Sequence, residues 1–172
     1  MLSDWYHNIV GNTDVMKWTD LVLLKNEWYH FCVVWSSASS LMEFHVNGVL
    51  VKSHVTTTSR LSNSGGTLVV GQDQDSLGGG FALNQAFGGE IYQLNVFSRA
   101  LRIEEIAAMY YDGRCSRLAS SLVHDVVVGW EEFLGATRSG AVQEVSAECD
   151  ERNFLGKVTQ LVMQELSTCD RH

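Results

Sequence analysis

The sequence predicts an all-β fold of antiparallel strands, with one short helix on a sheet face. Residues 27–35 are rich in aromatic and β-branched side chains, which favours a strand. Residues 41–55 alternate apolar and polar side chains around Asn47-Gly48, a dipeptide typical of tight hairpin turns. Residues 103–110 instead place apolar side chains at helical spacing. We therefore expect paired strands and a helix that packs on them.

The hairpin over residues 41–55 is predicted to bury one face. Side chains alternate between the two faces of a strand, so apolar residues two positions apart share a face. The first strand of the hairpin places three apolar residues in that register, namely Met42, Phe44 and Val46. The polar residues between them, Glu43 and His45, are expected on the opposite face.

The remaining elements follow in order along the chain. Residues 56–66 are rich in Ser, Thr and Gly and indicate a loop, and residues 67–70 indicate the next strand. Residues 91–97 predict a further strand, and Ser98 is a suitable N-cap for the helix that follows. Residues 123–130 predict a later strand, rich in valine.

Length and composition limit the classes of function. The 172 residues, of which 45% are hydrophobic, fit one domain with a core and a small appendage. A net charge of −8 argues against nucleic acid and against an anionic membrane surface, because both attract clustered Lys and Arg. No stretch has the roughly 18 apolar residues of a membrane span.

The most informative segment is an acidic, glycine-rich stretch after residues 67–70. Asp73 and Asp75 lie two positions apart with Gln74 between them, and three glycines follow at residues 78–80. Calcium takes six to eight oxygen ligands from carboxylates, amides and carbonyls, and glycine allows the sharp backbone bends that bring such donors together. The pattern indicates a calcium loop, and the alternative is an acidic surface turn that binds no ion.

The neighbouring residues resemble a known family. An apolar strand, G-Q-x-Q-D, G-G-x-F, Q-x-F-x-G and a second strand follow one another between residues 67 and 97. This order resembles the calcium-binding loop of the pentraxin family, and the resemblance extends from about residue 10 to residue 149. It implies an extracellular jelly-roll sandwich of the laminin-G and concanavalin A type, built from two antiparallel sheets, that holds a calcium pair.

The resemblance also implies roles for particular residues. Asp73 and Asp75 match side-chain ligands of the family, Gln74 matches a backbone-carbonyl ligand, and Gln85 matches a ligand of the second ion. Asp14 aligns with an acidic position near the family's ligand pocket.

Two departures from the family pattern weaken the expected site. Ala82 stands where the family has a further carboxylate, which should weaken the second ion most. Further family ligands belong to a first third that this chain lacks. We therefore expect a pentraxin-like domain over residues 1–150 without its first third. The N-terminus shows no signal-peptide pattern, which together with the resemblance predicts a fragment of a longer protein.

The four cysteines are not spaced like the ligands of a zinc site. From the residues alone their pairing stays open, and four reduced cytosolic thiols are the alternative. The resemblance implies a disulfide between Cys115 and Cys149. It also implies that Cys32 is a buried free thiol, because its family partner lies in the missing third. Cys169 is expected to pair outside the domain or to stay free.

The last residues predict a helical extension over residues 151–172. Phe154, Val158 and Leu161 share one face of an amphipathic helix of about fourteen residues, a length that is marginal in isolation. We expect this helix to dock on the domain, or to begin a following module or an oligomerisation segment.

Catalysis is not predicted. Glycoside hydrolases share the concanavalin-like fold and need two carboxyl groups that flank a cleft, but their strand-borne E-x-D-x-x-E pattern is absent. The nucleophile motif G-x-S-x-G is also missing, and the six histidines show no H-x-H or i,i+4 pair.

The sequence therefore predicts a calcium-dependent, non-enzymatic recognition module of an extracellular protein. Its partners are expected to be anionic or carbohydrate ligands, or a protein partner held through calcium, and the family favours a homo-oligomer. The alternative is a structural or protein-binding module in an adhesion-type receptor or matrix protein, with a degenerate calcium site.

Overall fold

The computed structural model describes residues 5–8, 15–18, 21–55, 67–112, 118–140, 142–144 and 161–164. Its strands are β1 (Trp5–Asn8), β2 (Val15–Trp18), β3 (Phe31–Ser36), β4 (Leu41–Val46), β5 (Val49–Val55), β6 (Asn95–Phe97), β7 (Val126–Val128) and β8 (Leu161–Gln164). Its helices are α1 (Ile103–Asp112), α2 (Ser120–Val123) and α3 (Trp130–Leu134), with a 3-10 turn η1 (Leu83–Gln85).

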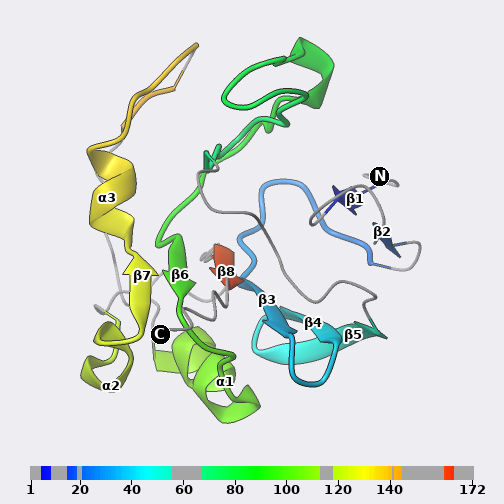
Figure 1. Cartoon of the computed structure of the whole chain (residues 1–172), viewed down its shortest axis with the longest axis vertical. Helices are drawn as coiled ribbons and strands as arrows, with labels where there is room; N and C mark the ends of the chain where they lie inside the picture. The colour runs from blue at the N-terminus through cyan, green and yellow to red at the C-terminus, as the bar shows by residue number, and fades with distance from the viewer. Residues whose placement is uncertain are drawn as a thin grey trace, which may run out of the picture.

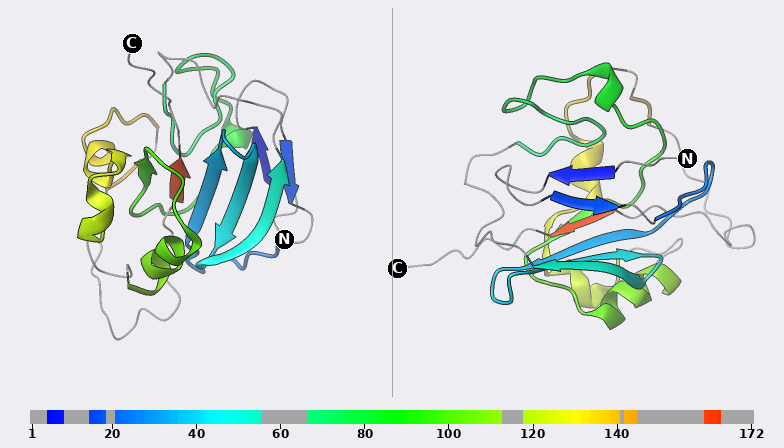
Figure 2. Two further views of the ribbon diagram at one scale, coloured as in Figure 1. Left: turned by 60° about the horizontal axis from the view of Figure 1, so that its bottom comes forward. Right: turned by 90° about the vertical axis from the view of Figure 1, so that its right-hand side faces the viewer.

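Most of the strands form one large sheet in the order β5-β4-β3-β8-β6-β7, and β1 pairs with β2 in a separate hairpin (Figure 1). The right-hand view of Figure 2 shows α1 on one side of the large sheet and the β1–β2 hairpin on the other. The prediction of a mainly β fold is therefore confirmed. The jelly-roll sandwich is not confirmed, because the described residues contain one large sheet and only a two-stranded second one.

The β4–β5 hairpin agrees with its prediction. The strands pair antiparallel from Leu41 opposite Val55 to Val46 opposite Val49. Asn47 and Gly48 have φ values of 53° and 78°, and two positive φ angles define the turn that matches the twist of paired strands. Gly48 also needs its lack of a side chain, because a Cβ there would lie 3.2 Å from the Ala107 Cα of α1.

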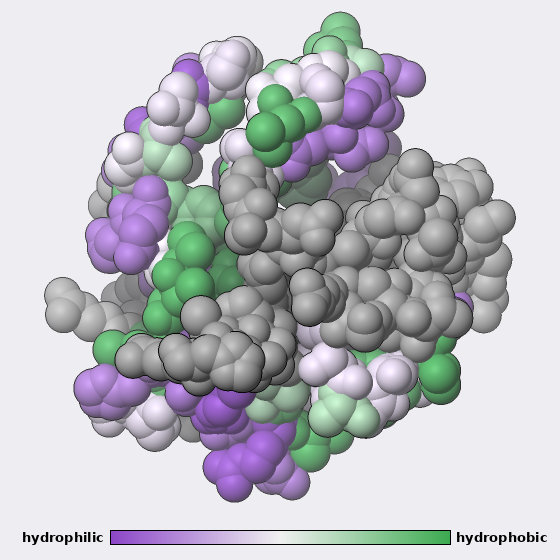
Figure 3. Space-filling model, viewed as in Figure 1, coloured by the Kyte–Doolittle hydropathy of each residue, from purple (hydrophilic) through white to green (hydrophobic). Residues whose placement is uncertain are grey.

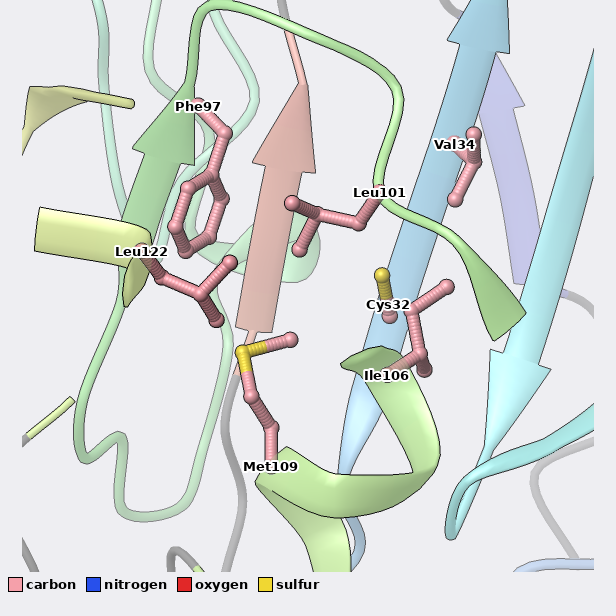
Figure 4. Close-up of a cluster of buried hydrophobic side chains, with 7 residues drawn as sticks. All are labelled: Cys32, Val34, Phe97, Leu101, Ile106, Met109 and Leu122. Carbon is pink, nitrogen blue, oxygen red and sulfur yellow. The ribbon is translucent and has the colours of Figure 1, made fainter. Parts of the chain in front are cut away.

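The core lies on both faces of the large sheet. On one face of β3, Cys32 and Val34 join Phe97 of β6 and residues of the helical layer, and the seven buried members of this cluster are shown in Figure 4. On the other face, Val33 and Trp35 pack with Met42, Phe44 and Val46. Alternate side chains of β3 therefore pack into two hydrophobic clusters, one on each face of the sheet, and neither face of β3 is exposed to solvent.

Helix α1 covers the first of these faces. Ile106 is fully buried and Met109 is 7% exposed, whereas Ile103 is 49% exposed. The predicted apolar stripe is thus correct in its centre, and its first member lies at the edge of the contact. The helix-facing side of β4 carries His45, which is 1% exposed, so the polar face of the predicted hairpin is also covered.

The sequence predicts a C-terminal helix that includes residues 161–164, but these residues form strand β8. β8 lies between β3 and β6 and pairs parallel with both. A lone helix of this length is marginal, whereas a strand between two others shares backbone hydrogen bonds on both edges. The rest of residues 151–172 lies outside the described part of the chain. The large sheet is consequently mixed rather than wholly antiparallel.

Three further predicted strands are corrected. Of residues 91–97, only Asn95–Phe97 form a strand. Residues 67–70 have no regular strand structure. Within residues 123–130, only Val126–Val128 form a strand, and Trp130 begins α3. The N–H group of Gly129 donates to the Glu132 carboxylate at 2.8 Å. An acid in the first turn of a helix favours helix formation, which explains why the chain leaves the sheet here. The described residues therefore hold α2 and α3, which were not predicted, in addition to the helix expected at residues 103–110.

An ion-pair network joins the segment after β6, the start of α1 and the segment before β7. The Arg99 guanidinium donates to both carboxylate oxygens of Glu105 at 2.8 and 2.9 Å, and to Asp125 at 2.9 Å. The backbone N–H of Arg102 also donates to Glu105 at 2.8 Å. Chiefly through the Arg99 hydrogen bonds, the pKa of Glu105 falls from 4.5 to about 2. The network therefore fastens the start of α1 to both flanking segments.

Replacing this carboxylate should weaken the fold in a pH-dependent way. We expect Glu105→Gln to lower the free energy of unfolding at pH 7 by about 1–3 kcal/mol, the typical contribution of hydrogen bonds to charged groups. Folding lowers the pKa of Glu105, so its stabilisation is present above pH 4.5 and is lost as the pH falls from 4.5 to about 2. When the pH is lowered from 4.5 to about 2, the free energy of unfolding should fall less in the variant than in the parent. Urea unfolding followed by circular dichroism measures this difference.

Glu104 provides the matched control, because it precedes Glu105 in the same helical turn and is exposed. Glu104→Gln should leave the unfolding free energy within about 0.5 kcal/mol of the parent. Equal losses in the two variants would contradict a structural role for the network.

Candidate functional site

The candidate site lies on residues 71–90, here called the acidic loop. The loop extends away from the large sheet before the chain enters β6 (Figure 1). Its two ends meet at its base, where the Phe87 N–H donates to the Gly71 carbonyl at 2.8 Å. Gly71, Gly78 and Gly80 have φ values of 83°, 65° and 76°, a region that glycine adopts without steric cost. The glycines therefore supply the bends that the sequence pattern predicts.

Two glutamine side chains brace the acidic loop from within. The Gln74 amide donates to the Thr67 carbonyl at 2.8 Å and accepts from the Gly78 N–H at 2.9 Å. The Gln72 amide donates to the Ala82 carbonyl at 3.1 Å. These bonds satisfy backbone groups of a segment that has no regular secondary structure. The bracing fixes the backbone of Gln74, whose carbonyl is the predicted calcium ligand.

Asp73 and Gln85 lie together although twelve positions separate them. The Gln85 Nε2 donates to the Asp73 Oδ2 at 3.4 Å. Asp73 and Gln85 are both exposed, Gln85 ends the 3-10 turn η1, and its N–H group donates to the Ala82 carbonyl at 3.0 Å. The fold thus joins two of the predicted ligands at one point.

Asp75 is placed by close packing rather than by a side-chain bond. A Cβ built on Gly80 would lie 2.7 Å from the Asp75 Cβ and 3.1 Å from its backbone nitrogen. Between these two residues, Ser76 and Gly79 exchange backbone hydrogen bonds of 3.2 and 2.9 Å. The tight turn therefore brings Gly80 back against Asp75, and only glycine fits there.

The donors on this loop suit calcium in kind. Asp73 and Asp75 supply exposed carboxylates, and the Gln74 carbonyl and the Gln85 amide supply neutral oxygens of the sort that calcium accepts. Gln85 would need to turn its amide so that Oε1 rather than Nε2 faces Asp73. The set comprises four residues, whereas calcium takes six to eight oxygens, so both aspartates would have to bind through two oxygens to reach six. Within the described residues, no three His, Cys, Asp or Glu side chains gather into a group that could hold a metal ion.

Apolar side chains surround these acids on the loop surface. Leu83 is 94% exposed and Leu77 is 74% exposed, with Phe81 and Phe87 each close to half exposed. Figure 3 shows hydrophobic and hydrophilic residues side by side on this projecting part of the molecule. The surface therefore offers both charge and apolar contact area to a ligand.

Several predicted site residues lie outside the described residues. These are Asp14 and the two cysteines of the expected disulfide, Cys115 and Cys149. Their roles stay predictions.

Cys32 is a buried free thiol, which confirms its prediction. It pairs with His45 across β3 and β4, and burial raises the pKa of the Cys32 thiol far above its usual value. Burial also lowers the pKa of His45, although Glu43 lies 3.6 Å from its Nε2 and opposes this shift. Both groups are therefore neutral in the core at neutral pH and serve packing.

Two residues that shape the loop were not identified from the sequence as site residues. Gln72 braces the loop, and its place in an alternating run of amides and acids was the available signal. Asn95 is 4% exposed at the loop exit. A polar residue inside the apolar run Leu94 to Phe97 was the signal there, because buried polar groups need partners.

Comparisons with known proteins agree with the resemblance. The model described as the Pentaxin family matches residues 3–139. Pentraxin-4 of Homo sapiens is 37% identical over 112 residues, which make up 62% of this chain and 23% of that protein. C-reactive protein 1.1 of Limulus polyphemus is 30% identical over 149 residues, with 86% of this chain and 60% of that protein covered.

Neuronal pentraxin-2 of Cavia porcellus is 30% identical over 146 residues, covering 80% of this chain and 33% of that protein. The chain therefore spans between 23% and 60% of the length of these curated relatives.

The packing of Gly80 against Asp75 gives a direct test of the loop structure. Gly80→Ala should displace the loop, because the added Cβ meets backbone and side-chain atoms of Asp75 and the φ of 76° costs alanine about 1–2 kcal/mol. We expect large amide chemical-shift changes over residues 71–90 in two-dimensional NMR spectra, with the core amides unchanged. Gly88→Ala is the control, since a Cβ there meets nothing within 4 Å. Similar spectra for the two variants would refute the loop geometry.

Proposed function

Because the chain belongs to the pentraxin family, we propose that it is a calcium-dependent, non-enzymatic recognition module of an extracellular protein. The observation that carries the proposal is the contact between Asp73 and Gln85 on a loop whose backbone is braced by glutamine side chains. A preorganised loop loses less conformational entropy on binding than a flexible one.

In this proposal each loop residue has one task. The carboxylates of Asp73 and Asp75 supply the negative charge, and the Gln74 carbonyl supplies a further oxygen to the first ion. Gln85 supplies an amide oxygen to the second. Bound calcium would supply a positive charge that attracts anionic or hydroxyl oxygens of a ligand. The chain's own contribution is to hold the donors and to expose Leu77 and Leu83 beside them.

The ligand class follows from charge and surface. Anionic groups, carbohydrate hydroxyls or acidic residues of a protein partner would reach the ion, whereas the net charge of −8 disfavours nucleic acid. A homo-oligomer would multiply such weak contacts by avidity. Family membership supports an extracellular location and the Cys115–Cys149 disulfide. Within the described residues, no helix combines the length and the apolar character that crossing a bilayer requires.

A structural module with a degenerate calcium site is the second candidate. Ala82 removes a carboxylate that the family places beside this loop, and only two acids remain at its tip. In that case the exposed apolar side chains would form a protein-binding surface that needs no ion.

Calcium titration separates the two candidates. With four donors we expect a dissociation constant of about 10⁻³ M or weaker, so amide chemical shifts are the suitable readout. Added calcium should move amides of residues 71–90 in the parent protein. Asp73→Asn combined with Asp75→Asn should abolish these shifts, because the charge is removed at constant size.

Glu90→Gln is the matched control, since Glu90 is an exposed acid on the same loop that is not a predicted ligand. It should titrate like the parent. Calcium shifts that persist in the double variant, or that are absent in the parent, would favour the structural module.

Restoring the missing carboxylate should strengthen binding. Ala82 is the N-cap of η1, and the Gln85 N–H donates to its carbonyl at 3.0 Å, so position 82 adjoins a predicted ligand. Ala82→Glu should therefore lower the calcium dissociation constant about tenfold, or ~1.4 kcal/mol. Ala82→Gln is the neutral control and should change it little. An unchanged affinity in Ala82→Glu would show that position 82 does not face the ion.

A further inference from the structure

A buried amide stands at the exit of the acidic loop. Asn95 begins β6 and is 4% exposed, between Leu94 at 0% and Val96 at 6%. Burying an amide is unfavourable unless its polar atoms are hydrogen bonded. The hydrogen-bond partners of the Asn95 side chain therefore show which segments it connects.

The Asn95 side chain joins two segments far apart in the sequence. Its Nδ2 donates to the Gln93 carbonyl at 3.0 Å, and its Oδ1 accepts from the Trp130 N–H at 3.2 Å. Gln93 belongs to the exit of the loop, and Trp130 is the first residue of α3. One amide thus ties the loop exit to a helix start.

The backbone that Asn95 holds is conformationally strained. Gln93 has a φ of 58°, a left-handed conformation that is unfavourable for residues other than glycine. Such conformations persist where the surroundings determine them, and they often mark functional segments. The hydrogen bond from Asn95 to the Gln93 carbonyl is a contact that holds this bend.

The start of α3, to which Asn95 binds, is itself held in place. The Tyr92 ring contacts the Trp130 ring edge-on, with centroids 5.8 Å apart. The Gly129 N–H donates to the Glu132 carboxylate at 2.8 Å, and a Cβ at Gly129 would lie 2.9 Å from that carboxylate oxygen. The loop exit is therefore anchored to a helix start with little freedom.

We propose that Asn95 is a positioning residue for the acidic loop, which sets the direction of the exit segment so that Gln85 faces Asp73. This inference rests on the proposed calcium function. The two ligands lie on opposite arms of the loop, one after Gly71 and one before β6. Their 3.4 Å contact lies inside the loop that the Phe87–Gly71 hydrogen bond closes. The Gln93 bend lies between this closure and β6, so Asn95 acts on Gln85 through the direction in which the segment after Phe87 joins the sheet.

The test compares Asn95→Ala with Val96→Ala. Both remove a buried side chain from β6, but Val96 has no side-chain polar group and cannot hold Gln93. Two readouts are needed on the full chain: the calcium dissociation constant from amide shifts, and the backbone heteronuclear NOE over residues 83–93 without calcium. A merely structural role would lower thermal stability in both variants and leave these readouts alike.

We expect Asn95→Ala to weaken calcium binding about two- to thirty-fold, the range for residues that modulate a site through a network. Its NOE values over residues 83–93 should also fall, while Val96→Ala keeps both at parent levels. Equal dissociation constants and NOE values in the two variants would overturn the inference. If the parent shows no calcium shifts, the proposed function fails, and the NOE comparison alone then decides whether Asn95 positions the loop.

A second variant covers the case in which Asn95→Ala does not fold. Gln93→Gly keeps Asn95 but admits many conformations at the bend, because glycine adopts φ values of either sign. It should lower the NOE over residues 83–93 and weaken calcium binding, while it relieves strain and preserves or raises the melting temperature. NOE values and calcium affinity equal to those of the parent would overturn the inference.

Discussion

The rest of the structure depends on the packing of α1 against one face of the large sheet. This contact buries Ile106 and Met109 over Cys32 of β3 and Phe97 of β6, so it fixes the two halves of the sheet relative to each other. β6 is the strand into which the acidic loop leads. Arg99 then links the same helix, through Glu105, to Asp125 of the segment before β7. The acidic loop therefore leads into a strand that is firmly held in the sheet, as precise placement of ligands requires.

The acidic loop combines a preorganised backbone with a modest number of charges. Glutamine amides rather than charged pairs brace it, which leaves Asp73 and Asp75 exposed. Two carboxylates repel each other less than the three or more of a high-affinity site. The small number of carboxylates also limits calcium affinity. A ligand that supplies further oxygens would strengthen the site, and an oligomer would strengthen ligand binding through avidity.

Local patterns were predictable from the sequence, and long-range ones were not. The β4–β5 hairpin and α1 follow from a two-residue turn and from helical spacing, which act between neighbours. β8 could not be predicted, because the apolar run at residues 161–163 suits a helix or a strand and its partners β3 and β6 are distant in sequence. The loop ligands were found through a family resemblance, and the structure brings Asp73 to Gln85. Gln72 and Asn95 were missed because their roles exist only once distant backbone groups come within hydrogen-bond reach.

The central claim is that a braced, glycine-bent loop holds a divalent cation through Asp73 and Asp75. The most direct measurement is an anomalous difference map from crystals of this protein grown with calcium. The account predicts a peak at the loop, with oxygens of both aspartates at about 2.3–2.6 Å and the Gln74 carbonyl among the ligands. A map with no peak at the loop at saturating calcium, with both carboxylates turned to solvent, would contradict it.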